Sequence, residues 1–92
     1  MKRASVIIAV TKKSVHAAAL RVLNQADDFS IVASTFNLME TFNAVEELEP
    51  SAVLISHDMT VYPEFEVMHA LFKAMRIRWI VLETNPQRSL HP

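Results

Sequence analysis

The sequence contains no glycine among its 92 residues, whereas an average protein has about 7%. A phosphate-binding loop needs glycines so that backbone N–H groups can surround the phosphate. A dinucleotide-binding fold needs them so that the backbone can approach the pyrophosphate closely. The absence of glycine therefore excludes both kinds of nucleotide site.

Cysteine is also absent, which excludes thiol catalysis, thiolate zinc sites and a disulfide framework. A cytoplasmic location is compatible with this composition. The histidines offer no other metal site, because their spacing does not match that of metal ligands. These histidines are His16, His57, His69 and His91. We therefore expect neither a metal nor a cofactor.

The chain lacks an excess of charge, since its net charge is −1 and its acids and bases are interspersed. This balance argues against a nucleic-acid partner. Long apolar runs are missing too, because Val6–Val10 falls far short of the roughly 20 residues that span a bilayer. We expect a soluble protein without a membrane partner, with one domain over residues 1–84 and a loosely held tail over 85–92.

Four segments have the composition of β-strands. Residues 6–10, 52–55 and 79–82 are continuous apolar runs, which are typical of strands buried on both faces. Residues 30–35 have mixed polarity, which suits an edge strand. Three amphipathic helices are predicted between these strands. A loop is expected at residues 56–62.

Helix boundaries follow from capping residues. Ser14 is expected to cap the first helix, Asn37 and Glu40 form a capping box at the second, and Pro63 begins the third. The predicted buried stripes of the three helices are Val15, Ala18, Ala19, Val22 and Leu23; Leu38, Phe42, Val45 and Leu48; and Phe65, Met68, Leu71, Phe72 and Met75. The order βαβαβαβ predicts an α/β fold with a parallel sheet between two helical layers.

Several segments of the sequence resemble receiver domains of response regulators, notably the receivers of chemotaxis methylesterases and of helix-turn-helix regulators. Residues 20–33, LRVLNQADDFSIVA, are similar to their first helix and second strand. Residues 46–55, EELEPSAVLI, resemble the family's approach to its third strand, and residues 56–60 fall where "D-x-x-M-P" is common. The resemblance covers about residues 5–84. It implies a flavodoxin-like fold with strand order 2-1-3-4, truncated before the fifth strand.

The departures from the family bear on function. Val10 and Thr11 stand where the resemblance places the acidic pair that binds magnesium, and Ser56 stands at the phospho-acceptor aspartate. Glu83, or Thr84 in a shifted register, stands at the hydroxyl residue. Phosphoryl transfer to a carboxylate needs a metal held by carboxylates and a carboxylate nucleophile. We therefore expect a degenerate receiver that is not an enzyme.

Two alternatives remain at this site. Ser56 could act as a nucleophile with His57, although neighbours on a strand point to opposite faces. Asp58 could serve as an acceptor two residues late. The alternative function is thus a signalling acceptor that keeps phosphate binding or modification at Ser56 or Asp58. Lys12 and Lys13, with the nearby helix N-termini, offer a minor small-anion site.

The predicted fourth strand suggests how a degenerate receiver acts. In the order 2-1-3-4 it becomes an apolar edge, which proteins seldom leave bare. We expect it to pair with a protein partner or a second copy as a homodimer, in a bacterial two-component or transcription-regulating pathway; a piece of a longer protein is the other reading. The predicted interaction surface comprises Met59, Val61, Tyr62, Trp79 and Val81. A DNA-binding adaptor is a weaker third possibility.

Overall fold

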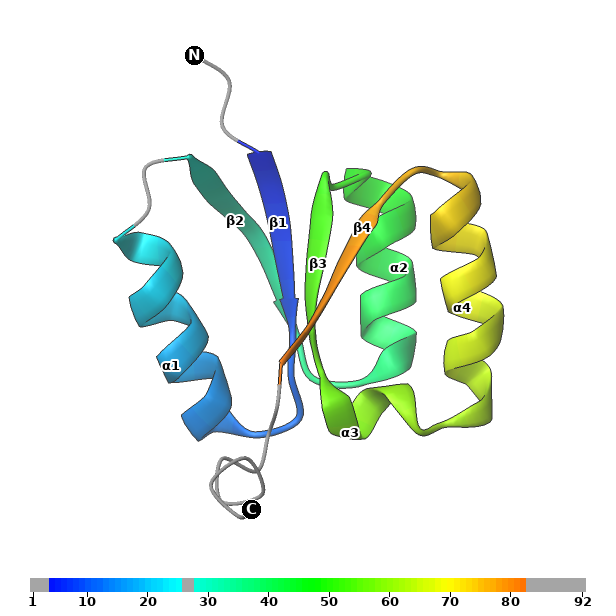
Figure 1. Cartoon of the computed structure of the whole chain (residues 1–92), viewed down its shortest axis with the longest axis horizontal. Coiled ribbons are helices and arrows are strands. Elements are labelled where there is room, and N and C mark those ends of the chain that lie inside the picture. The colour runs from blue at the N-terminus through cyan, green and yellow to red at the C-terminus, as the bar shows by residue number, and fades with distance from the viewer. Residues whose placement is uncertain (1–3, 26–27, 83–92) are drawn as a thin grey trace, which may run out of the picture.

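The computed structural model describes residues 4–25 and 28–82. Within these ranges, four parallel strands form one sheet in the order β2-β1-β3-β4, as predicted (Figure 1). The strands are β1 (Ala4–Ala9), β2 (Phe29–Thr35), β3 (Ala52–Ser56) and β4 (Arg78–Leu82). The helices are α1 (Lys13–Asn24), α2 (Leu38–Leu48), α3 (His57–Thr60) and α4 (Pro63–Ala74). The predicted tail, residues 85–92, lies outside the described residues.

The sheet separates two apolar cores, so the predicted three layers are confirmed. Helix α1 packs on one face, and α2 and α4 pack on the other (Figure 1). Side chains of successive strand residues point to opposite faces. In β3, Val53 and Ile55 therefore face α2 and α4, whereas Leu54 faces α1. The buried strands β1 and β3 tolerate this because almost all of their residues are apolar.

The helix caps agree with the sequence in one case and differ in another. The Asn37 side chain accepts the Glu40 N–H at 2.8 Å, and the Glu40 carboxylate accepts the Phe36 N–H at 2.9 Å. The capping box at α2 is therefore confirmed, displaced by one residue on its reciprocal side. Ser14 does not cap α1, because the helix begins at Lys13 and Ser14 already lies inside it. Its cap residue, Lys12, makes no side-chain capping bond.

Four residues assigned to buried stripes are exposed: Ala18, Val22, Leu48 and Leu71. Val22 lines a hollow between α1 and the sheet, where no second helix covers it in the described part of the chain. Leu48 belongs to the last turn of α2. Thr41 instead enters the core, fully buried. Its hydroxyl bonds to the Thr35 hydroxyl at 2.7 Å, which satisfies a polar group that burial would otherwise penalise.

The predicted loop at 56–62 contains the short helix α3. This turn directs Met59 into the core between the sheet, α2 and α4, where it is 1% exposed. Met59 is therefore not part of an exposed interaction surface, contrary to the prediction. Val61 and Tyr62, in the turn between α3 and α4, are exposed. Among the helices of the described ranges, none has the length and apolarity that crossing a bilayer would require.

Candidate functional site

The carboxyl ends of β1 and β3 lie side by side, and the residues that follow them form a small polar cluster. Ser56 ends β3 and is fully buried, as is Val10 directly after β1. Thr11 is exposed at the same end, and its hydroxyl donates a hydrogen bond to the carboxylate of Asp58 on α3. The fold thus brings together Thr11, Ser56 and Asp58. Thr11 is 45 positions before Ser56 in the sequence, and Asp58 lies on a different element, α3. Ligands of open α/β sheets bind at this end.

Asp58 carries the negative charge of the cluster. Partial burial raises the pKa of its carboxyl, but the Ser56 and Thr11 hydroxyls, a backbone N–H and the charge of Lys12 lower it further. The net pKa lies below the ordinary value of an aspartate. Asp58 is therefore a carboxylate at neutral pH, held by the loop after β1.

The cluster is not fully satisfied. The Ser56 hydroxyl and the Asp58 Oδ1 oxygen are buried and have no hydrogen-bond partner in the described part of the chain. Ser56 is close enough to Asp58 to lower its pKa without reaching hydrogen-bond geometry. Ser56 also makes no hydrogen bond with His57, so the arrangement of a nucleophile and its base is not formed.

The residues at this end do not fit a magnesium ion. Val10 is apolar and Thr11 is neutral, whereas magnesium takes hard anionic oxygen ligands. Asp58 offers one carboxylate, and no cluster of three ionisable metal-ligand side chains occurs within residues 4–25 and 28–82. Glu83 and Thr84, at the predicted hydroxyl position, lie outside the described residues.

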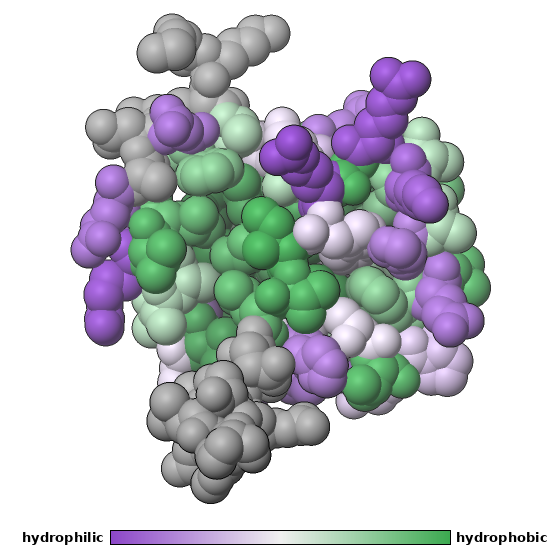
Figure 2. Space-filling model, in the orientation of Figure 1, coloured by the Kyte–Doolittle hydropathy of each residue, from purple (hydrophilic) through white to green (hydrophobic). Residues whose placement is uncertain are grey.

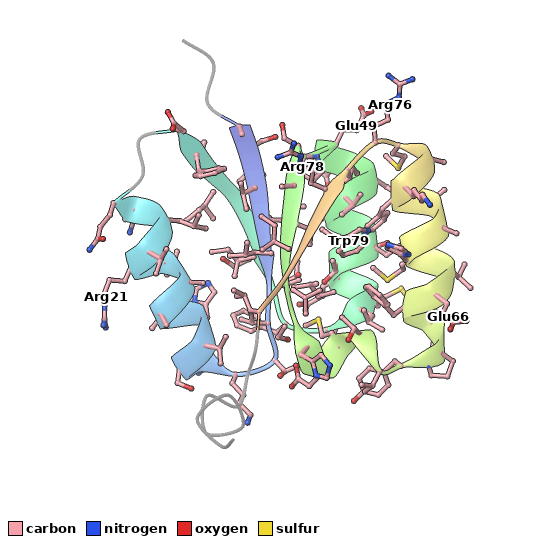
Figure 3. The ribbon with its side chains drawn as sticks, in the orientation of Figure 1. Arg21, Glu49, Glu66, Arg76, Arg78 and Trp79 are labelled. Carbon is pink, nitrogen blue, oxygen red and sulfur yellow. The ribbon has the colours of Figure 1, made fainter. Side chains whose placement is uncertain are left out.

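The other charged residues divide between the two ends of the sheet. Lys12 and Lys13 lie beside the cluster, whereas Arg76 and Arg78 lie at the opposite end, where β4 begins (Figure 3). The Asp28 carbonyl accepts the Ala4 N–H at 2.8 Å, which places Asp28 in an exposed turn at the amino end of β1. Asp27 is not among the described residues.

The described histidines are dispersed. His16 bonds to the Ser34 hydroxyl at 2.8 Å, and His57 lies on α3. His69 is exposed, and its ring stacks on Phe65 at a centroid distance of 5.7 Å. His16 and His69 therefore each have a structural partner, and His57 is a residue of α3. His91 lies outside the described ranges.

The second candidate site is the outer edge of β4. In the described part of the chain, β4 pairs with β3 alone. The Arg78 N–H donates to the Ser51 carbonyl at 3.1 Å, and alternate residues of a strand direct their backbone groups to the same side. The backbone groups of Trp79 and Val81 therefore point outward from the sheet.

The two side chains predicted for this edge differ in exposure. Val81 is 50% exposed and its neighbour Ile80 is 43% exposed. The Trp79 ring lies inward, stacked on Phe72 at 4.7 Å and edge-on to Phe65 at 5.1 Å. Trp79 thus anchors the strand with its side chain, and it contributes to the edge through its backbone.

Sequence reasoning missed an apolar surface beside this edge. A hollow of about 190 Å³ lies between α1 and the sheet, lined by Val15, Ala18, Ala19, Val22, Leu54 and Leu82. In Figure 2, apolar side chains gather over the centre of this view, between α1 and β4. The sequence did indicate this surface, because no predicted element covers Ile80 and Leu82. Val22 was not recognised as part of it, because its spacing also suits the buried stripe of a helix.

Comparisons with known proteins identify the fold. No family model and no curated protein matches the sequence. Among solved structures, the chain is similar to a DNA-binding response regulator of the LuxR family from Staphylococcus aureus, with a TM-score of 0.72 and 26% sequence identity. The match covers 89% of this chain and 69% of that chain. The fold is therefore receiver-like.

Proposed function

We propose that this chain is a pseudo-receiver that is not phosphorylated and that acts by protein–protein contact, with a second copy as its partner. The likeness to a response regulator supports a signalling or regulatory domain. Within that role, we place the protein in a cytoplasmic two-component or transcription-regulating pathway. It needs no cofactor and has no enzymatic activity in this proposal.

The observation that carries the proposal is the chemistry at the ends of β1 and β3. The acceptor position is the buried Ser56, and the position of the acidic pair holds Val10 and Thr11. A phosphoryl group in transfer develops negative charge that a carboxylate-bound metal must neutralise. The one carboxylate of the cluster, that of Asp58, already accepts a hydrogen bond from the Thr11 hydroxyl. The cluster therefore supports one fixed conformation rather than a switch.

The β4 edge supports the role of a contact surface. Trp79 and Val81 direct backbone donors and acceptors outward, and exposed apolar side chains flank them. Such an edge can extend its sheet by pairing with another strand. Two copies related by a two-fold axis would join antiparallel through the same residues.

Beryllofluoride with magnesium, an analogue of a phosphoryl group, tests the first half of the proposal. We expect backbone amide signals near Ser56 and Asp58 to stay unchanged in a magnetic-resonance titration of the whole chain. An Asp58→Asn variant serves as the matched control. A saturable, magnesium-dependent shift that this variant abolishes would overturn the proposal.

A signalling acceptor modified at Ser56 or Asp58 is the alternative function. The observation that favours it is the lowered pKa of Asp58, which keeps a charged oxygen at the sheet's ligand-binding end. Incubation with acetyl phosphate and magnesium, followed by intact-mass measurement, separates the two functions. Addition of one phosphoryl group, lost in Asp58→Asn or Ser56→Ala, would support the acceptor.

A further inference from the structure

A groove runs between α2 and α4, on the helical layer opposite α1. It has a volume of about 450 Å³ and is lined by Leu38, Met39, Phe42, Glu64, Val67 and Met68. Met39 is 70% exposed and Val67 is 72% exposed, so apolar side chains on both walls meet solvent. Phe42 and Met68 contact the core and form its floor. Exposed apolar surface of this extent commonly marks an interaction site.

The groove continues toward the start of both helices. A second hollow of about 280 Å³ shares Leu38 and Glu64 with it and adds Phe36 and Tyr62, which are exposed. The exposed ring of Tyr62, predicted as interaction surface, therefore belongs to this region. An elongated apolar channel between two helices is the shape that receives the apolar stripe of another helix.

The charged residue in the lining of the groove is acidic. It is Glu64, in the first turn of α4. Helix α2 contains no lysine or arginine, and Lys73 lies in the last turn of α4, at the end opposite Glu64. By contrast, α1 contains Lys13 and Arg21 and no acidic residue. Figure 3 shows Glu66 on α4 and Arg21 on α1, on opposite sides of the molecule.

From the apolar channel and its acidic end we infer that the α2–α4 groove binds an amphipathic helix of a partner protein, one with an apolar stripe and a lysine- or arginine-bearing flank. Apolar residues at helical spacing fill the channel between Met39 and Val67. Basic residues beside the stripe meet Glu64. This surface is separate from the β4 edge, although its second hollow reaches Thr11 of the Asp58 cluster. It therefore adds a second contact to the proposed function.

The probe is an 18-residue synthetic peptide with leucines at helical i, i+3, i+4, i+7 spacing and lysines on the remaining positions. A matched peptide carries glutamates in place of the lysines. Amide shifts of the labelled chain are followed in each titration. We expect the lysine peptide to bind at least about tenfold more tightly, with shifts at Leu38, Phe42 and Met68.

Two valines of nearly equal exposure provide matched variants. Val67→Glu should weaken binding of the lysine peptide at least about tenfold, whereas Val22→Glu, at a site 68% exposed on α1, should change it less than about twofold. Glu64→Gln should weaken binding about threefold and reduce its salt dependence. Circular dichroism and Trp79 fluorescence confirm that each variant is folded.

Three outcomes would overturn the inference. The two peptides could bind equally, or the shifts could lie on α1 and β4. Thirdly, Val67→Glu could abolish self-association of the chain while leaving peptide binding unchanged, which would make a second copy the occupant. Loss of binding in Val67→Glu alone supports the partner helix.

Discussion

The two edges of the sheet differ in how they meet solvent. Strand β2 carries Ser30, Ser34 and Thr35, and its pairing with β1 shifts register between Val6 and Ile7. Strand β4 is regular against β3 and is apolar from Trp79 to Leu82. Polar residues and bulges are the means by which proteins keep edge strands from pairing with other chains. Edge β2 therefore has the protection that β4 lacks.

The exposed apolar edge is nevertheless firmly attached to the core. Trp79 stacks on Phe72, which in turn stacks on Phe42 at 6.5 Å, and Ile77 before the strand is buried. This aromatic row joins β4 to α4 and α2. The edge with the more apolar surface is thus held to the core by a row of aromatic rings.

The largest expected effect concerns this attachment. Phe72→Ala should lower the free energy of unfolding by about 3–5 kcal/mol, because it removes a fully buried ring beneath Trp79. Phe29→Ala, in the half-buried first position of β2, should lower it by about 1–2 kcal/mol. Urea denaturation followed by circular dichroism measures both. Equal losses would show that β4 is no better anchored than β2.

The second prediction tests the direction of the backbone groups in β4. Ile80→Pro removes an N–H that faces β3 and should cost about 1–3 kcal/mol, because its carbonyl partner on β3 is buried. Val81→Pro removes an outward N–H and should cost less than about 1 kcal/mol. Thermal unfolding of the two variants provides the comparison. The reverse order would contradict the register inferred for the edge.

The third prediction concerns the turn that leads into β4. Arg76 has φ 62°, a left-handed conformation that glycine adopts without steric cost. Arg76→Gly should therefore stabilise the chain by about 1 kcal/mol in urea denaturation, whereas Arg78→Gly, inside the strand, should destabilise it by about 0.5–1 kcal/mol. Destabilisation by both changes would mean that the Arg76 side chain itself holds the turn.

The smallest effect belongs to the cluster between the two edges. Because folding lowers the pKa of Asp58, its contribution to stability is present above the unfolded value near 3.8 and is lost as pH falls through the folded value. Asp58→Asn should flatten this acid limb of unfolding, measured by urea midpoints between neutral and acidic pH. Self-association should not change, since Asp58 lies on α3 and is not a residue of the β4 edge. A variant with an unaltered acid limb would place the lowered pKa elsewhere.

The element order was predictable because it depends on local periodicity and on general rules of chain connection, whereas the strand order 2-1-3-4 was implied by the resemblance to receiver domains. Continuous apolar runs marked β1 and β3 correctly, and the Asn37–Glu40 pair marked the start of α2. The exposed edge at β4 followed from strand order alone.

Side-chain placement in the turns was not predictable in the same way. The sequence gives no sign that α3 turns Met59 inward, since four residues are too few to show a helical period. Asp58 was recognised only as a late acceptor. Its bond with Thr11 depends on two loops that meet only when β1 and β3 pair, a contact between residues 47 positions apart.

Molar mass by light scattering over a hundredfold dilution measures whether two copies join through β4. We expect the wild-type mass to rise toward twice the 10.4 kDa chain mass with concentration. Val81→Lys should remain monomeric, and Val32→Lys, at the 40% exposed valine of β2, should behave as the wild type. A wild type that stays monomeric throughout, or one that Val32→Lys dissociates while Val81→Lys does not, would show that β4 is not a dimer edge.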